Sequence, residues 1–249
     1  MGRHGCDLMT RLLNVDSNTP ELPDLGPGFA AILQAISRKI NFSLCAPYLG
    51  QALPEGPFDG VMMTGSGVAW CVDAPEGRIV QDIWKQVVRW RMPIWGSCNG
   101  RQLAAFMLGD RCAASPHGDE DGLAKAITLT DSGRGYPMMQ GRASQFHAPA
   151  VHRDEVQCLS EGARLLARND HSSVQAFAYE TADISFWGTQ YHPEFSLVNV
   201  AAWLADPGKP LPDIEERDGH GDLALATRTL ELQNWPAHVT SRYRTTGAK

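Results

Sequence analysis

Apolar segments with two different periodicities alternate along the chain as far as residue 204. Short apolar runs typical of buried strands occupy residues 11–15, 41–45, 58–64, 92–97 and 185–190. Longer segments that favour helices occupy residues 28–40, 76–91, 99–108 and 196–204. Strands that alternate with helices form βαβ units, so we expect an α/β domain with an open, mostly parallel sheet flanked by helices.

Two of the predicted helices have a clear apolar face. In the first, the side chains expected to point inward are Phe29, Ile32, Leu33, Ile36 and Ile40. In the second, they are Ile79, Val80, Ile83, Val87 and Val88. Both helices are therefore predicted to pack on the sheet.

The pattern weakens between residues 110 and 152, where Gly, Pro, His and polar residues predominate. We expect strands and loops that cover a site in this region. A second change follows residue 206, where closely spaced Pro and Gly residues end the preceding helix. We interpret residues 1–206 as one folded domain. Residues 207–249 are predicted to form a C-terminal appendage, with a helix at 223–232, packed on that domain.

The composition is typical of a globular protein, with 43% hydrophobic and 20% charged residues. The formal net charge of −6 and the lack of Lys and Arg clusters argue against nucleic acid as a partner. No apolar run is long enough to span a bilayer, and no apolar signal-peptide core follows Met1. We therefore expect a cytoplasmic protein with no membrane partner.

The six cysteines are scattered, without a Cys-x-x-Cys pair and without His at zinc-finger spacing. This distribution predicts free thiols, with no metal site and no cofactor. A free cysteine is usually a small buried hydrophobic residue, and only Cys98 has a sequence context that indicates another role.

Cys98 lies in the segment Gly-Ser-Cys-Asn-Gly, between an apolar strand and a helix. A strand that leads into a Gly-x-Cys-x-Gly turn and then a helix has the pattern of a nucleophile elbow. Such a turn places Cys98 at the carboxyl end of a strand and at a helix N-terminus, which favours a thiolate. The backbone N–H of Asn99 is predicted to donate to an oxyanion in the same space.

A catalytic thiol needs a base within hydrogen-bond reach, and His192 is the best candidate among eight histidines. An apolar strand ends just before it, and Pro193 fixes the backbone so that Glu194 stands two residues further on. Glu194 would bind one ring nitrogen of His192 and leave the other facing Cys98. The sequence thus predicts a Cys-His-Glu triad.

Together, Gly-Ser-Cys-Asn-Gly-Arg-Gln at residues 96–102 and Tyr-His-Pro-Glu at residues 191–194 resemble the motifs of the class I glutamine amidotransferases. The resemblance covers residues 11–204, which would make residues 1–206 the catalytic domain. It implies the flavodoxin-like fold of that family. It also implies attack of Cys98 on a γ-carboxamide, release of an amine and hydrolysis of a γ-glutamyl thioester.

The resemblance also implies supporting roles for other residues. Gly65 and Ser66 fall at the oxyanion loop of the family, with Asn99 as the second donor, and Gln102 matches a residue that holds the glutamyl group. Further candidates for substrate binding are Arg101, Gln145, Phe146 and His147. Met138, Met139 and Phe146 are predicted either to line a pocket for the leaving group or to fill a core beneath a loop.

The chain departs from the family pattern in the oxyanion loop and at two residues near Cys98. The oxyanion loop is Thr-Gly-Ser-Gly at residues 64–67, whereas Ser-Gly-Gly-Pro is usual. Asn99 replaces an aromatic or aliphatic residue, and Arg101 replaces Met or His. Both changes are expected to make the mouth of the pocket more polar, unless Arg101 is simply an exposed helix residue.

Three functions are compatible with these motifs. We favour a stand-alone hydrolase of γ-glutamyl amides, γ-glutamyl peptides or glutamine, because residues 146–156 resemble the γ-glutamyl peptidase branch and no phosphate-binding loop is present. Its partner would be a small γ-glutamyl substrate. The alternative is the glutaminase subunit of a biosynthetic amidotransferase, which would deliver ammonia to a separate synthase. A non-catalytic binding module is the third possibility, but all three triad residues are present.

Overall fold

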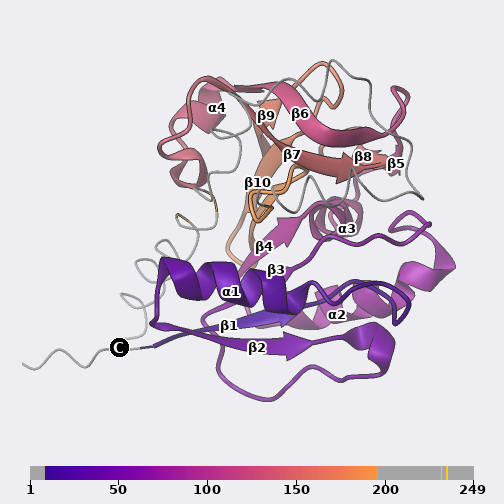
Figure 1. Ribbon diagram of the computed structural model, residues 1–249, viewed down its shortest axis with the longest axis vertical. Coiled ribbons are helices and arrows are strands. Elements are labelled where there is room, and N and C mark those ends of the chain that lie inside the picture. Colours follow the sequence, from indigo (N-terminus) through magenta and orange to yellow (C-terminus); the bar gives the residue numbers. More distant parts are fainter. Residues whose placement is uncertain (1–8, 196–230, 232–233, 235–249) are drawn as a thin grey trace, which may run out of the picture.

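A computed structural model describes residues 9–195 together with residues 231 and 234. It contains a nine-stranded sheet in the order β2-β1-β3-β4-β11-β10-β9-β6-β7 (Figure 1). Neighbouring strands are parallel from β2 (Ile40–Cys45) through β1 (Thr10–Val15), β3 (Gly60–Met63) and β4 (Pro93–Ser97) to β11 (Ser185–Thr189). They are antiparallel from β11 through β10 (Ala176–Glu180), β9 (Ala163–Arg168) and β6 (Glu120–Leu129) to β7 (Gln145–His152).

The remaining elements are helices and a small second sheet. The α-helices of the described residues are α1 (Gly26–Ile36), α2 (Arg78–Arg89), α3 (Asn99–Met107) and the short α4 (Asp131–Arg134). Single 3₁₀ turns are formed by η1 (Pro47–Leu49), η2 (Pro75–Gly77) and η3 (Pro137–Met139). The small sheet pairs β5 (Cys112–Ala114) with β8 (Asp154–Val156).

Each face of the parallel strands carries its own helices, because successive strand residues point to opposite sides. On one face, Leu12 packs in a buried cluster with Phe29 of α1. On the other face, the adjacent Leu13 packs in a second cluster with Val87 of α2 and Leu103 of α3. Helices thus flank the parallel strands on both sides.

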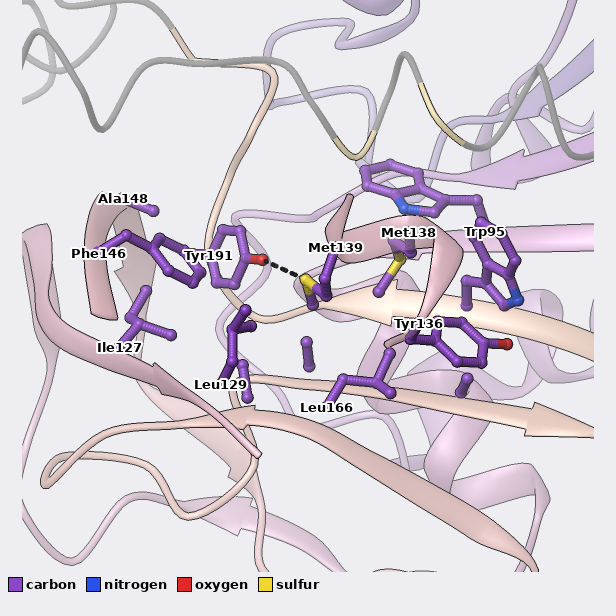
Figure 2. Packing of buried hydrophobic residues seen from close by; sticks show 14 of the residues in the cluster. Trp95, Ile127, Leu129, Tyr136, Met138, Met139, Phe146, Ala148, Leu166 and Tyr191 are labelled. Atoms are coloured by element: carbon purple, nitrogen blue, oxygen red, sulfur yellow. Dashed lines mark hydrogen bonds between the residues drawn. The ribbon is translucent and has the colours of Figure 1, made fainter. Parts of the chain in front are cut away.

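The antiparallel strands extend the first of these clusters. Met138 and Met139 of η3 are buried among the side chains of β6, β7 and β9, as Figure 2 shows. The ring of Tyr191 lies edge-on to Phe146, with 5.5 Å between centroids, and its hydroxyl points toward Met139. Of the two alternatives for Met138 and Met139, the structure therefore favours core filling over a pocket.

Three neighbouring parallel strands end at one edge of the sheet. Met63 of β3 lies beside Gly96 of β4, and Ser97 of β4 lies beside Thr189 of β11. The chain therefore leaves all three strands at the same place. Ligands bind at the carboxyl edge of an open α/β sheet. The register brings the loop at residues 64–67, the Cys98 turn and residues 192–194 together at this edge.

The α/β fold predicted from the sequence is confirmed, with differences in detail. The first helix ends at Ile36 rather than at residue 40, because Ile40 opens β2 and pairs with Thr10. Ile79, predicted to point inward, is 45% exposed, and Trp84 is buried instead. The region from 110 to 152 forms β5, β6, α4, η3 and β7.

Part of the sequence prediction concerns residues that the structure does not describe. The helix predicted at 196–204 lies outside the described residues. So does the helix predicted at 223–232, except for Glu231, which is helical. None of the helices in the described part is long and apolar enough to cross a membrane.

Candidate active site

Cys98 occupies a strained turn between β4 and α3. Its backbone has φ 45° and ψ −102°, in a region that residues with a side chain rarely adopt. The Cys98 amide donates to the carbonyl oxygen of Thr189 at 2.8 Å, which ties the turn to β11. A Cβ atom at Gly100 would collide with the backbone carbonyl group of Met63. The glycine therefore allows α3 to start directly against β3.

His192 and Glu194 follow β11 and are both buried. Nδ1 of His192 lies 2.7 Å from Oε1 of Glu194, and the His192 amide donates to the carbonyl oxygen of Pro149 at 2.7 Å. The ring stacks flat on Phe195, with 4.3 Å between centroids. The imidazole is therefore held by the carboxylate, the backbone and an aromatic ring.

The protonation of His192 follows from its neighbours. Burial alone would lower its pKa, but the Glu194 carboxylate and a hydrogen bond with Cys98 more than offset burial and raise the pKa to about 10. At neutral pH His192 is therefore an imidazolium, with Glu194 on one side and Cys98 on the other.

Ser97 is part of this arrangement, although sequence reasoning did not single it out. Its hydroxyl donates to Oε1 of Glu194 at 2.7 Å and lies 3.4 Å from Nδ1 of His192. Ser97 is the last residue of β4, next to Cys98 and opposite Thr189 of β11. The sequence signal that could have identified Ser97 is its position directly before Cys98. Adjacent parallel strands end at the same edge of a sheet, so the last residue of β4 lies close to the segment that follows β11.

Gly65 lies between the Cys98 and His192 side chains. A Cβ atom added there would lie 3.5 Å from Cβ of Cys98 and 3.1 Å from Cε1 of His192. Within the described residues, the backbone amides of Gly65 and Asn99 donate to no protein acceptor. The two amides lie at the Cys98 turn and are available as donors to a bound oxygen atom.

The Ser66 side chain holds the loop against the segment after β1. Its hydroxyl donates to the carbonyl oxygen of Ser17 at 2.8 Å and lies 3.0 Å from Oδ1 of Asn18. The same Oδ1 accepts from the Gly67 amide at 3.0 Å. The Thr-Gly-Ser-Gly loop, which departs from the usual sequence, is thus fixed by the segment after β1.

Gln102 and Arg101 are both buried beneath the turn. Nε2 of Gln102 donates to the carbonyl oxygen of Asp154 at 2.6 Å and to Oε1 of Gln190 at 3.2 Å. Arg101 is fully buried and donates to the carbonyl oxygen of Val174 and to Oε1 of Gln190. Arg101 is therefore neither exposed nor at the mouth of a pocket; it lies inside the protein.

Three predicted substrate-binding residues of β7 are not brought to the Cys98 turn. Sγ of Cys98 lies 3.7 Å from the carbonyl oxygen of Val151, but Gln145 is six positions earlier on the same strand, or roughly 20 Å away. Phe146 packs in the core against Tyr191, and Nδ1 of His147 accepts from the Ala126 amide at 3.2 Å.

Metal ligands of the usual kinds are not gathered anywhere in the described part of the chain. No three His, Cys, Asp or Glu side chains there are grouped so that they would hold a metal ion. The described cysteines are free thiols, and among them Cys45, Cys98 and Cys112 are buried.

The chain is similar in sequence to proteins that act on γ-glutamyl compounds. It is 34% identical over 163 residues to a gamma-glutamyl-L-1-hydroxyisopropylamide hydrolase from a Pseudomonas species, which covers 64% of this chain. The match spans 55% of the length of that relative. It is 25% identical over 163 residues to a glutamine-hydrolyzing GMP synthase subunit from Ignicoccus hospitalis, covering 66% of this chain and 81% of the relative.

Solved structures share the fold. A glutamine amidotransferase from Thermotoga maritima superposes with a TM-score of 0.66 at 18% identity, covering 94% of this chain and 97% of the other. A putative GMP synthase subunit from Thermoplasma acidophilum gives the same TM-score at 18% identity, covering 97% and 98% of the two chains. The family model for glutamine amidotransferase class-I matches residues 59–204, which include the Gly65 loop, the Cys98 turn and the His192–Glu194 pair. The chain therefore belongs to the class I glutamine amidotransferase family.

Proposed function

We propose that this protein hydrolyses the amide bond of a γ-glutamyl amide or γ-glutamyl peptide, with Cys98 as nucleophile, His192 as its base and Glu194 as the group that orients His192. The observation that carries the proposal is the strained Cys98 turn, which lies beside an imidazole bound through Nδ1 to a buried carboxylate at 2.7 Å. This is the arrangement that thiol-dependent acyl transfer requires.

In the first half of the reaction, the Cys98 proton resides on His192 and the thiolate attacks the γ-carbonyl carbon of the substrate. The backbone amides of Gly65 and Asn99 donate to the oxyanion that forms on the carbonyl oxygen. His192 then gives its proton to the leaving nitrogen, the C–N bond breaks and the amine departs. The product on the enzyme is a γ-glutamyl thioester of Cys98.

In the second half, water attacks the thioester. His192, now neutral, takes a proton from the water, and the same two amides stabilise the second oxyanion. Collapse of this intermediate breaks the C–S bond and releases glutamate. The Cys98 thiolate and the protonated His192 are restored, and the cycle requires neither ATP nor a metal ion.

The substrate class is supported by the relatives. The Pseudomonas relative is named for hydrolysis of a γ-glutamyl amide whose amine is larger than ammonia. We therefore expect γ-glutamyl alkylamides to be cleaved at least as well as glutamine. The test is to measure glutamate release by the purified full chain from glutamine and from γ-glutamyl alkylamides, and to compare kcat/KM with that of a Cys98→Ala variant.

A glutaminase subunit is the second candidate function. It is favoured by the similarity to the glutamine-hydrolyzing GMP synthase subunit of Ignicoccus hospitalis, which extends over 81% of that relative. Such a protein would cleave glutamine and transfer ammonia to a separate synthase. A marked preference for glutamine, together with a rise in kcat when a synthase is added, would favour this function over the free-standing hydrolase.

A further inference from the structure

A buried cation without a carboxylate partner lies beneath the Cys98 turn. The Arg101 side chain is fully buried, and no described carboxylate forms an ion pair with it. An isolated buried charge is costly, so a guanidinium in this position requires compensation by hydrogen bonds and by nearby negative charge. Burial lowers the pKa of Arg101 to about 10, which leaves it charged at neutral pH.

The hydrogen bonds of Arg101 lead toward the sulfur of Cys98. Nη1 donates to the carbonyl oxygen of Val174 at 2.6 Å, and Nη2 donates to Oε1 of Gln190. On the other side of the same amide group, Nε2 of Gln190 lies 3.3 Å from Sγ of Cys98. One amide group therefore connects the guanidinium with the proposed nucleophile.

The orientation of the Gln190 amide is determined by its donors. A guanidinium has only N–H donors, so the atom that faces Arg101 is the oxygen. Nε2 of Gln102 also donates to this oxygen, at 3.2 Å. The –NH₂ group of Gln190 is consequently turned toward Cys98, where it donates to the sulfur. An N–H donor favours a thiolate over a thiol, since the anion is the stronger acceptor.

We propose that Arg101 is a positioning residue for catalysis: through the amide of Gln190 it directs an N–H donor at Cys98 and stabilises the thiolate. This inference rests on the proposed role of Cys98 as nucleophile. The thiolate in turn supplies part of the negative charge that the buried guanidinium lacks. We call this chain of hydrogen bonds from Arg101 through Gln190 to Cys98 the relay.

Other charged groups face the same region. His192, after β11, contacts Cys98 directly, and Glu194 lies behind His192. Asp110, after α3, and Glu155 of β8 act on Arg101 through space, whereas Cys112 of β5 is a neutral thiol, because burial raises its pKa to about 12. These groups are unchanged in the variants proposed below, so their influence is common to all of them.

The readout is the rate at which iodoacetamide alkylates Cys98, followed at a series of pH values by mass spectrometry of the Cys98 peptide. Alkylation requires the thiolate, so the pH midpoint reports its stability without reference to any substrate. Arg101→Met should move the midpoint up by roughly one pH unit, which is about a tenfold lower rate below the midpoint. Lys85→Met, which removes an exposed charge on α2, should leave it unchanged.

A second variant separates positioning from simple packing. Gln190→Glu keeps the size of the side chain and gives Arg101 a carboxylate partner, but it removes the N–H donor and places negative charge beside the sulfur. The relay predicts a midpoint at least as high as in Arg101→Met. Gln190→Met removes the same N–H donor without adding a charge, so the relay again predicts a raised midpoint, whereas a role in packing alone predicts the wild-type midpoint. Because both Gln190 variants leave Arg101 in place, they remain informative if Arg101→Met fails to fold.

Arg101→Lys gives a third comparison. A lysine keeps the charge but presents a single ammonium group where the guanidinium reaches two acceptors, so the midpoint should lie between those of wild type and Arg101→Met. Wild-type midpoints in both Arg101→Met and Gln190→Glu would overturn the relay. That result is distinct from failure of the proposed function, which would be shown by full glutamate release in the Cys98→Ala variant.

Discussion

The hydroxyl of Tyr191 donates to Oε1 of Glu231 at 2.9 Å, so the residue directly before His192 is bound to one that follows it by 40 positions. The same carboxylate forms a buried ion pair with Arg142, with Nε to Oε1 at 2.6 Å and Nη2 to Oε2 at 2.7 Å. Nearby, the Asn234 amide donates to the carbonyl oxygens of Met138 and Gln140, each at 3.0 Å.

This contact predicts that Glu231 contributes to the stability of the whole chain. Glu231→Gln should lower the free energy of unfolding by about 3 kcal/mol, because it removes the carboxylate charge that binds the buried Arg142 guanidinium. Urea unfolding of the purified full chain measures the loss. Glu161→Gln, which changes an exposed carboxylate, serves as control and should change stability by less than about 0.5 kcal/mol.

Replacement of both partners should restore part of the loss. In the double variant Arg142→Met and Glu231→Leu, neither charge remains buried, so its free energy of unfolding should exceed that of Glu231→Gln. A Glu231→Gln protein as stable as wild type would show that the pair does not contribute to folding in solution.

The second prediction concerns the nucleophile. Cys98→Ala should abolish glutamate release while the thermal transition remains cooperative, because the thiolate is the attacking group in the proposed mechanism. Cys158→Ala, which removes an exposed thiol, should leave kcat/KM unchanged. Glutamate release from γ-glutamyl alkylamide by the two variants is the measurement. Comparable activity in both would refute the role of Cys98.

The third prediction ranks the residues around the imidazole. His192→Asn should lower kcat by about 10⁴-fold, since it removes the proton carrier, whereas Glu194→Gln should be at least about tenfold less severe. Ser97→Ala should have a smaller effect than Glu194→Gln, because the carboxylate keeps its contact with His192 when the 2.7 Å hydrogen bond from Ser97 is lost. Steady-state kinetics at one pH establishes the order. A Ser97→Ala variant as inactive as His192→Asn would contradict it.

The fourth prediction uses the tight fit of Gly65. In Gly65→Ala, the new methyl group would lie 3.1 Å from Cε1 of His192, closer than ordinary van der Waals contact, so the ring or the loop must shift. We expect kcat to fall by about 10²-fold with little change in stability. Gly28→Ala in α1 is a matched control, because a Cβ atom there meets nothing within 4 Å. Equal kcat in the two variants would argue against the close approach of Gly65 and His192.

Much of the fold followed from the sequence, because strands and helices that alternate with short connections leave few possible topologies. The predicted Cys-His-Glu triad requires the strands before Cys98 and His192 to end near each other, and β4 and β11 are neighbours in the sheet. The antiparallel strands were not resolved individually. Buried positions of β6 include Glu120 and Gly122, and Pro149 interrupts β7, so the period-two pattern of apolar residues is weak in the sequence.

The interior of the candidate site was less predictable. Sequence spacing places residues on elements, but it does not show which side chains meet across them. Arg101 and Gln190 are 89 positions apart and become partners only because α3 packs beneath the end of β11. An arginine on a helix is also usually exposed, so its full burial here runs against the general tendency of that residue type.

The last prediction concerns pH and the pair formed by His192 and Glu194. In the folded protein the pKa of His192 is about 10, against an ordinary value of 6.5, because the Glu194 carboxylate and Cys98 outweigh the opposing effect of burial. Below pH 6.5 both folded and unfolded chains carry the proton, so the stabilisation is fully present. Above it only the folded chain retains the proton, and the contribution is lost as the pH rises toward 10. Relative to Glu194→Gln, wild-type stability should therefore decline over this interval by up to about 1.4 kcal/mol per pH unit, measured by urea unfolding at successive pH values. Parallel pH profiles for the two proteins would show that Glu194 does not hold the proton on His192.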